Sequence, residues 1–165
     1  MLWQIEGDCE LFRTILVVCV GNICRSPIGE RLLADRLQER GWTMSVSSAG
    51  LAALVGHGAD ETAKAVAKAH GLDLDGHVAR RFTRELGLNH DLILTMEPRH
   101  RREIIKVAPD LSGRVMLFDQ WLGGKGIADP YGKSRQFHEE AFSLIEAAGT
   151  AWAEKLTPSR KRVSA

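Results

Sequence analysis

Short apolar runs alternate along this chain with longer segments in which apolar residues recur every three or four positions. Four runs, at 14–19, 44–48, 91–95 and 114–118, have the length and the composition of strands that are buried on both faces of a parallel sheet. Residues that favour turns bound each run. The pattern therefore predicts a central sheet of four parallel strands.

Between these runs, apolar residues follow the period of helices. In the first such segment, Leu32, Leu33 and Leu37 mark one face of a helix that has Pro27 in its first turn and ends before Gly41. The other predicted helices are one that is capped by Asp60 or Thr62 and ends at Gly71, a short one near Glu85, one over 98–108 and one over about 134–156. Alternating strands and helices predict a single doubly wound α/β domain with helices flanking the sheet, and such folds bind ligands at the carboxyl ends of their strands.

The composition of the 165-residue chain excludes several classes of function. There are 22 Lys and Arg against 21 Asp and Glu, so the formal net charge of +1 gives no reason to expect nucleic acid as a partner. No apolar run approaches the roughly 20 residues of a membrane span, and the acidic N-terminal segment lacks the cationic start of a signal peptide. We therefore expect a cytoplasmic protein without direct membrane insertion. The three cysteines match no zinc-site spacing, which predicts a reduced compartment and no metal.

The same pattern sets the expected limits of the domain. We expect a domain over 14–156, an N-terminal extension over 1–13 and a basic, mobile tail over 157–165. Cys9 lies in the extension, and the sequence assigns it no role.

The most informative segment is the loop between the first strand and the first helix. A cysteine and an arginine enclose it, in the sequence Cys19-Val20-Gly21-Asn22-Ile23-Cys24-Arg25-Ser26-Pro27. The backbone N–H groups of such a loop can converge on a phosphate dianion, and Gly21 and Asn22 tolerate the left-handed conformations that this requires. The positive electrostatic field of these N–H groups also favours the thiolate form of Cys19, to which the hydroxyl of Ser26 can donate a hydrogen bond. The guanidinium of Arg25 can bind two phosphoryl oxygens at once. The loop therefore predicts a phosphate pocket with a cysteine nucleophile.

This loop and four other motifs resemble those of the low-molecular-weight protein-tyrosine phosphatases. The other motifs are Ser48-Ala49-Gly50, Gly76-His77-Val78-Ala79-Arg80, Asp91-Leu92-Ile93-Leu94-Thr95-Met96 and Asp129-Pro130-Tyr131. The resemblance extends over about 14–156 and implies a phosphatase that works without a cofactor. It implies that Cys19 is the nucleophile, that Arg25 holds the phosphoryl group, and that Asp129 is the general acid.

The resemblance also assigns the residues around this catalytic group. It implies a hydrogen-bond network that holds the loop in shape, formed by Asn22, Ser26, Ser48 and His77. It further implies that Leu54 and Tyr131 are the walls of a slot whose depth suits the long, flat side chain of phosphotyrosine.

Two residues inside the loop bear on specificity and regulation. Relatives that act on phosphoarginine carry threonine at the position of Ile23, so the isoleucine favours phosphotyrosine. Cys24 is either a packed apolar side chain or a second thiol that captures oxidised Cys19 as a reversible disulfide.

Within the family, the chain is most similar to bacterial members that are encoded with exopolysaccharide or capsule export systems. These members also carry stretches similar to Gly50-Leu51-Ala52-Ala53-Leu54-Val55-Gly56 and to Val115-Met116-Leu117-Phe118. This implies a phosphotyrosine protein as partner, namely the tyrosine-rich tail of a membrane tyrosine autokinase. The alternatives are a phosphoarginine phosphatase, an arsenate reductase and a phosphopeptide-binding module without catalysis. An arsenate reductase needs further cysteines after Cys24, and a binding module would have lost its nucleophile or acid, whereas Cys19 and Asp129 are both present.

Overall fold

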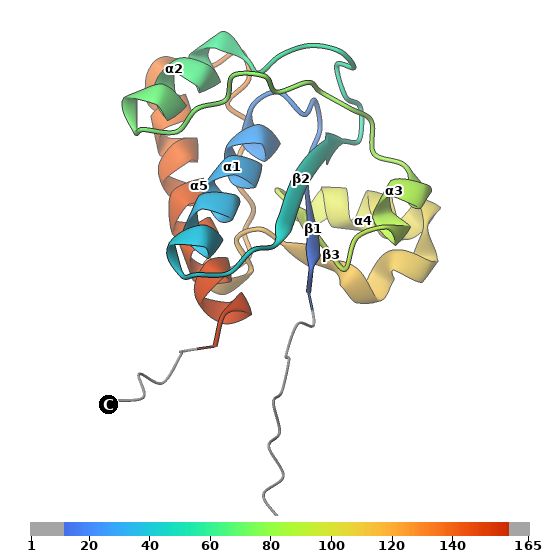
Figure 1. The fold of residues 1–165 in the computed structure, drawn as a ribbon. Helices are drawn as coiled ribbons and strands as arrows, with labels where there is room; N and C mark the ends of the chain where they lie inside the picture. The colour runs from blue at the N-terminus through green and yellow to red at the C-terminus, as the bar shows by residue number, and fades with distance from the viewer. Residues whose placement is uncertain (1–11, 159–165) are drawn as a thin grey trace, which may run out of the picture.

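A parallel sheet with the strand order β2-β1-β3-β4 forms the centre of the protein, as seen in a computed structural model that describes residues 12–158 (Figure 1). The strands are β1 (Thr14–Cys19), β2 (Ser45–Gly50), β3 (Leu92–Thr95) and β4 (Val115–Leu117). All three pairs of neighbouring strands are parallel. The predicted four-stranded doubly wound α/β fold is therefore confirmed.

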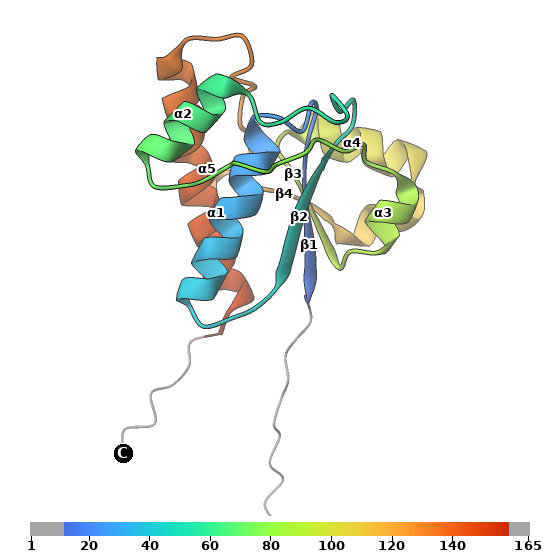
Figure 2. The same ribbon diagram turned by 45° about the horizontal axis from the view of Figure 1, so that its top comes forward.

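Helices cover both faces of this sheet. They are α1 (Arg25–Glu39), α2 (Glu61–Ala69), α3 (Arg84–Leu88), α4 (Pro98–Val107) and α5 (Arg135–Leu156), with short 3₁₀ turns η1 (Pro109–Arg114) and η2 (Gln120–Leu122). Figure 2 shows α1, α2 and α5 on one side of the sheet and α3 and α4 on the other. None of the helices within 12–158 is long and apolar enough to cross a membrane.

Two apolar cores hold these layers together, and β1 contributes to both. Ile15 and Val17 belong to the core beneath α1 and α5, whereas Leu16 and Val18 belong to the core beneath α4. All four side chains are fully buried. A strand that is covered on both faces needs apolar residues at every position, which explains why β1 was recognisable as a continuous apolar run.

The helix caps that the sequence suggested are largely in place. Asp60, rather than Thr62, caps α2 by accepting a hydrogen bond from the N–H of Ala63. Thr83 and Ser134 cap α3 and α5 in the same way. Strand β2 runs two residues beyond the predicted end, because Gly50 still pairs with Cys19 of β1. The turns η1 and η2 were not predicted.

Residues at both ends of the described chain, which were predicted to lie outside the domain, contact the domain. Phe12, which was assigned to the extension, packs against the main core, and the N–H of Arg13 donates to Asp91 Oδ2 over 2.8 Å. Thr157, which was assigned to the tail, is buried, and its hydroxyl donates to the carbonyl of Ala153. The rest of the predicted extension, including Cys9, and most of the tail lie outside the described residues.

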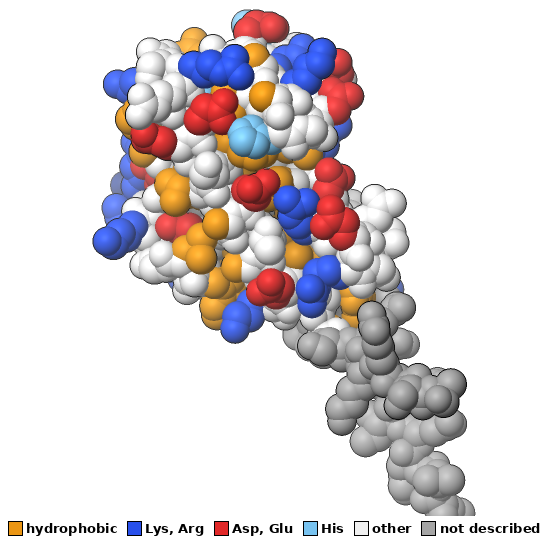
Figure 3. All heavy atoms as spheres, turned by 90° about the vertical axis from the view of Figure 1, so that its left-hand side faces the viewer, with side chains coloured by type: hydrophobic (Ala, Val, Ile, Leu, Met, Phe, Trp, Pro, Cys, Tyr) orange, Lys and Arg blue, Asp and Glu red, His pale blue; other side chains and the backbone are white. Residues whose placement is uncertain are grey.

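The surface on the side of α2 and α5 mixes both signs of charge with apolar patches. Figure 3 shows Lys, Arg, Asp and Glu side chains interspersed over this face. Positive and negative side chains thus alternate on this face, and no large area of one sign is formed there, in agreement with the near-neutral net charge of the chain. Attraction of an anion must therefore depend on local groups.

Candidate active site

The loop between β1 and α1 has its carbonyl groups turned outward. The carbonyls of Cys19, Val20 and Gly21 accept hydrogen bonds from the backbone N–H groups of residues 51, 52 and 54, over 3.0 to 3.1 Å. The next two carbonyls accept from the Nε2 of His77, over 2.6 Å, and from the N–H of residue 60, over 2.8 Å. Because these carbonyls face the surrounding protein, the N–H groups of the loop are available on its inner side. We call residues 19–26 the phosphate loop.

Asn22 fixes the shape of the phosphate loop. Its backbone is left-handed, with φ at 57°, and the residue is fully buried. The side-chain amide donates to the hydroxyls of Ser26, over 2.7 Å, and of Ser48, over 2.9 Å. Its oxygen accepts from the N–H of Arg80 over 2.9 Å, so every polar atom of the side chain is used to hold an otherwise unfavourable conformation.

The network around Asn22 extends to a carboxylate. Ser48 donates to Glu30 Oε2 over 2.6 Å, and His77 Nδ1 lies 3.9 Å from the same oxygen. Since a carbonyl can only accept, the Nε2 of His77 must carry the proton that reaches the loop. The structure thus brings together Asn22, Ser26, Ser48 and His77, the residues that were predicted as the supporting network, and adds Glu30 to them.

Glycine is required where β2 passes the phosphate loop. A Cβ at Gly50 would lie 2.4 Å from the carbonyl oxygen of Val20 and 3.0 Å from the backbone nitrogen of Asn22. Any side chain here would therefore push the loop away from its partners on residues 51–54. This close approach explains why a strand that lines the loop ends in glycine.

Cys19 lies at the bottom of a pocket of about 180 Å³. The pocket is lined by Cys19, Val20, Gly21, Ile23, Cys24, Arg25, Ala52, Leu54, Asp129 and Tyr131. The Sγ of Cys19 is 3.0 Å from the hydroxyl oxygen of Ser26. Because that hydroxyl accepts from Asn22, its own proton is free to point at the sulfur, where it would stabilise a thiolate.

Arg25 is a buried charge that is held from one side and open on the other. Its Nη1 donates to Glu97 Oε1, over 2.5 Å, and to the carbonyl of Ile127, over 2.8 Å. Its Nη2 lies 3.5 Å from Asp129 Oδ2, and its Nε is buried without a hydrogen-bond partner among the described residues. The edge formed by Nε and Nη2 therefore remains available for a ligand with two oxygens.

Glu97 lies against Arg25 in the structure but was not among the predicted site residues. Burial alone would raise its pKa, but hydrogen bonds from Arg99 and Arg25 lower the pKa of this carboxyl below its usual range. The ionised form thus pairs with the buried guanidinium of Arg25 and fixes its orientation. A signal was present, because Glu97 follows the third predicted strand at the sheet edge where ligands bind.

Asp129 stands at the mouth of the pocket on the segment 123–131, which we call the acid loop. Its side chain is 41% exposed, and its Oδ1 accepts from the N–H of Tyr131 over 3.1 Å. Leu54 and Tyr131, the predicted walls, are 41% and 57% exposed at the same rim. Residues from three distant parts of the sequence therefore meet at one opening.

Cys24 lies in the wall of the same pocket. It is 3% exposed, and burial raises the pKa of its thiol far above the ordinary value, with the negative charge of Asp60 adding to the effect. The two described cysteines, Cys19 and Cys24, are both free thiols. Within residues 12–158, no group of three or more His, Cys, Asp and Glu side chains is placed to hold a metal ion.

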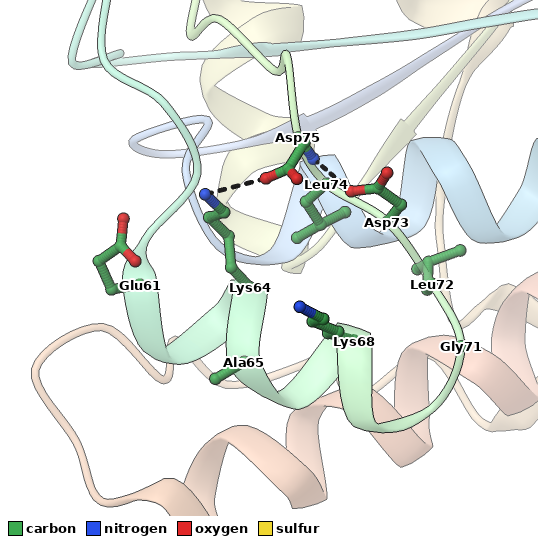
Figure 4. A pocket seen from close by; sticks show the side chains of 9 residues that line it. All are labelled: Glu61, Lys64, Ala65, Lys68, Gly71, Leu72, Asp73, Leu74 and Asp75. Atoms are coloured by element: carbon green, nitrogen blue, oxygen red, sulfur yellow. Dashed lines mark hydrogen bonds and ion pairs between the residues drawn. The ribbon is translucent and has the colours of Figure 1, made fainter.

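A larger hollow of about 700 Å³ lies elsewhere, between α2 and the segment 71–75 (Figure 4). Lys64 Nζ and Asp75 Oδ1 pair across it over 3.0 Å. It contains none of the predicted site residues, and its charged side chains are of both signs. The chemistry suggested by the sequence therefore belongs to the smaller pocket above Cys19.

Comparisons with known proteins agree with this geometry. A family model described as low molecular weight phosphotyrosine protein phosphatase matches residues 14–162. The protein-tyrosine-phosphatase Wzb of Escherichia coli is 51% identical over 146 residues, which cover 88% of this chain and 97% of that protein. A crystal structure of Escherichia coli Wzb in complex with sulphate has a TM-score of 0.84 at 47% identity and covers 88% of this chain and 99% of its own. The YwlE arginine phosphatase has a TM-score of 0.83 at 27% identity, with 89% and 97% covered.

Proposed function

We propose a function from the premise that the chain belongs to the low molecular weight phosphotyrosine protein phosphatase family, whose model matches residues 14–162. On this premise the protein is a hydrolase that removes phosphate from phosphotyrosine in proteins. The observation that carries the proposal is the arrangement above Cys19, where the carbonyls of the loop face outward, Arg25 Nε has no hydrogen-bond partner among the described residues, and Arg25 Nη2 has only Asp129 Oδ2, at 3.5 Å, near it. A phosphoryl dianion fits this cradle in charge and in shape.

In the first step, the thiolate of Cys19 attacks phosphorus in line with the ester bond. The phosphorus–oxygen bond to the phenol breaks as the sulfur–phosphorus bond forms, and Asp129 gives its proton to the departing phenolate oxygen. The hydroxyl of Ser26, 3.0 Å from the sulfur, holds the thiolate before the attack. The inward N–H groups and Arg25 stabilise the charge on the three equatorial oxygens.

In the second step, the same residues release the phosphate. Asp129, now a carboxylate, takes a proton from a water molecule whose oxygen attacks the phosphocysteine. The sulfur–phosphorus bond breaks, and Cys19 returns to its thiolate form while inorganic phosphate leaves. The 41% exposure of Asp129 suits this second role, because water must reach the side chain.

The pocket walls support phosphotyrosine over shorter or more polar substrates. Leu54 and Tyr131 stand at the rim, and the phosphate loop forms the floor, so a phosphate carried on a short side chain would bring its own backbone into the walls. Ile23 contributes an apolar, 8% exposed side chain to the same pocket. It offers no hydroxyl to a guanidinium leaving group, which argues against phosphoarginine.

We further propose that the substrate is the tyrosine-rich tail of a membrane tyrosine autokinase in exopolysaccharide production. Membership of the family implies that the substrate is a phosphotyrosine protein. The choice of a kinase tail rests on the motifs shared with exopolysaccharide-associated members and on the 51% identity to Wzb. Such a tail would place the reaction in the cytoplasm.

A comparison of three phosphopeptides tests the proposal. Peptides of one sequence that carry phosphotyrosine, phosphoserine or phosphoarginine are incubated with the protein, and the release of inorganic phosphate is measured. We expect kcat/KM for phosphotyrosine to exceed the others by at least about 100-fold, because the short side chain and the guanidinium each lose contacts in the pocket. A preference for phosphoarginine, or phosphate release that persists at the same rate in Cys19→Ser, would overturn it.

A further inference from the structure

The turn that leads from β4 to the acid loop is organised by one buried carboxylate. Asp119 is 7% exposed, and its Oδ2 accepts from the N–H of Gly126 over 2.8 Å. Its backbone carbonyl accepts from the N–H groups of Leu122, over 2.9 Å, and of Gly124, over 3.2 Å. Three N–H groups of the turn thus converge on a single residue.

The side chain of Asp119 is costly to bury in this way. Its Oδ1 has no hydrogen-bond partner among residues 12–158, and no ion pair to Asp119 is formed within them. A buried polar group with an unused acceptor destabilises the fold, so the contact that it does make calls for an explanation. The contact that it makes is to the acid loop, seven residues away along the chain.

The turn needs such a tie because its backbone has little intrinsic preference for one shape. Gly123, Gly124 and Gly126 all have positive φ, at 108°, 65° and 94°. Glycine adopts these angles without strain but also leaves them easily, so the segment is held by its hydrogen bonds. The carboxylate of Asp119 contributes the side-chain bond among them.

The restraint acts close to Asp129. Ile127 follows Gly126 directly, its N–H donates to the carbonyl of Met96 over 2.8 Å, and its own carbonyl accepts from Arg25 Nη1 over 2.8 Å. Asp129 lies two residues further, with its Oδ2 at 3.5 Å from Arg25 Nη2. Because Gly126 is joined directly to Ile127, a shift at Gly126 would disturb the two hydrogen bonds that hold Ile127 and, with them, the segment that carries the carboxyl group at the pocket mouth.

We propose that Asp119 is a positioning residue for proton transfer by Asp129. Its carboxylate holds the N–H of Gly126 and so sets the distance between Asp129 and the leaving oxygen. The proposal rests on the proposed function, in which Asp129 is the general acid. It predicts that loss of Asp119 slows phosphoryl transfer from a substrate whose leaving group needs a proton. Transfer from a substrate whose leaving group needs no proton should hardly change.

The test compares two substrates in single-turnover phosphorylation of the enzyme. Phosphotyrosine needs a proton for its leaving phenolate, whereas an aryl phosphate with an activated phenol does not. For Asp119→Ala we expect the phosphotyrosine rate to fall about tenfold and the activated rate by less than about twofold, since a small misplacement of a catalytic group is enough for such a loss. The ratio of the two rates does not depend on the fraction of folded protein.

Asp119→Asn is the matched control. Its amide oxygen can still accept from Gly126, so we expect the ratio to stay within about twofold of the parent. If Asp119→Ala does not fold, Asp119→Ser takes its place, because a hydroxyl is one atom too short to reach Gly126. The proposal would be overturned if Asp119→Ala lost the same factor in rate on both substrates. It would also be overturned if the ratio of the two rates changed as much in Asp119→Asn as in Asp119→Ala.

Asp129→Asn separates this proposal from the one on which it rests. If Asp129→Asn shows the leaving-group dependence and Asp119→Ala does not, Asp119 is no positioning residue while the general acid stands. If Asp129→Asn lowers both substrates equally, the acid role of Asp129 fails, and the role of Asp119 fails with it.

Discussion

The phosphate loop and the acid loop meet at one pocket but are built in opposite ways. In the phosphate loop, every carbonyl from Cys19 to Ile23 accepts a hydrogen bond from the surrounding protein, and Asn22 and Arg25 are buried. In the acid loop, Asp129 is 41% exposed, and the glycines before it have positive φ, with Gly124 and Gly126 both hydrogen-bonded to the single residue Asp119. One loop is fixed before any ligand arrives, whereas the other remains open to solvent.

This difference suits the chemistry that we propose for each loop. A cradle stabilises a transition state by dipoles that already point at the developing charge, so any freedom in the phosphate loop would weaken catalysis. A proton donor has to reach a leaving group, and later a water molecule, and then let the product out. Substitutions in the cradle should therefore affect all substrates, whereas those in the acid loop should depend on the leaving group.

The largest expected effect is that of Cys19→Ser. Turnover should fall by at least about 10⁴-fold, because a neutral hydroxyl is a far weaker nucleophile than a thiolate. The cradle itself should persist, so a non-hydrolysable phosphonate should bind within about fivefold of its parent affinity by calorimetry, since the N–H groups and Arg25 remain in place. Loss of both properties would show that the cradle depends on the sulfur, and turnover near the parent rate would remove Cys19 from its role.

Arg25→Lys should have the second largest effect. We expect kcat/KM to fall about 10²- to 10³-fold on every substrate, because an ammonium group cannot bind two oxygens of the transition state at once. Arg99→Lys is the matched control, since Arg99 contacts the same Glu97 from the exposed side, and it should change kcat/KM by less than about threefold. Similar kinetics for Arg25→Lys and the parent would contradict a bidentate contact.

The two loops also differed in how far the sequence could predict them. The phosphate loop lies between a continuous apolar strand and an amphipathic helix, so local patterns indicated its position, its shape and its charge. Glu97 was missed because its contact depends on pairing between strands: β3 beside β1 brings Glu97 to Arg25, 72 residues away in sequence. Asp119 contacts Gly126 only seven residues away, but no apolar period marks a carboxylate that is buried in a turn. Periodicity reports which residues are buried, but it does not report which buried residues become neighbours.

Ser48→Ala tests whether the cradle is fixed by its network or by its backbone alone. The substitution removes one of the two acceptors of the Asn22 amide and leaves Glu30 without a donor at 2.6 Å. We expect kcat to fall about tenfold with an activated aryl phosphate and with phosphotyrosine alike, since the loss of a single buried hydrogen bond is of this order. Thr83→Ala, which removes a cap on α3 away from the pocket, is the control for stability. A loss confined to phosphotyrosine would contradict the assignment of this network to the cradle.

Cys24→Ser should have the smallest effect on the untreated enzyme. It tests whether Cys24 protects Cys19 from irreversible oxidation. Peroxide converts the thiolate of Cys19 to a sulfenic acid, which can condense with the thiol of Cys24 to form a disulfide and water. Because burial raises the pKa of the Cys24 thiol, its thiolate is scarce near neutral pH, and closure should accelerate as the pH rises. We expect Cys24→Ser to keep more than about half of the parent activity before peroxide and to recover less with a thiol reductant afterwards, because nothing then protects Cys19 from further oxidation. Peptide mapping should find a Cys19–Cys24 linkage in the parent; equal recovery of both proteins would leave Cys24 as a packed side chain in the wall of a rigid cradle.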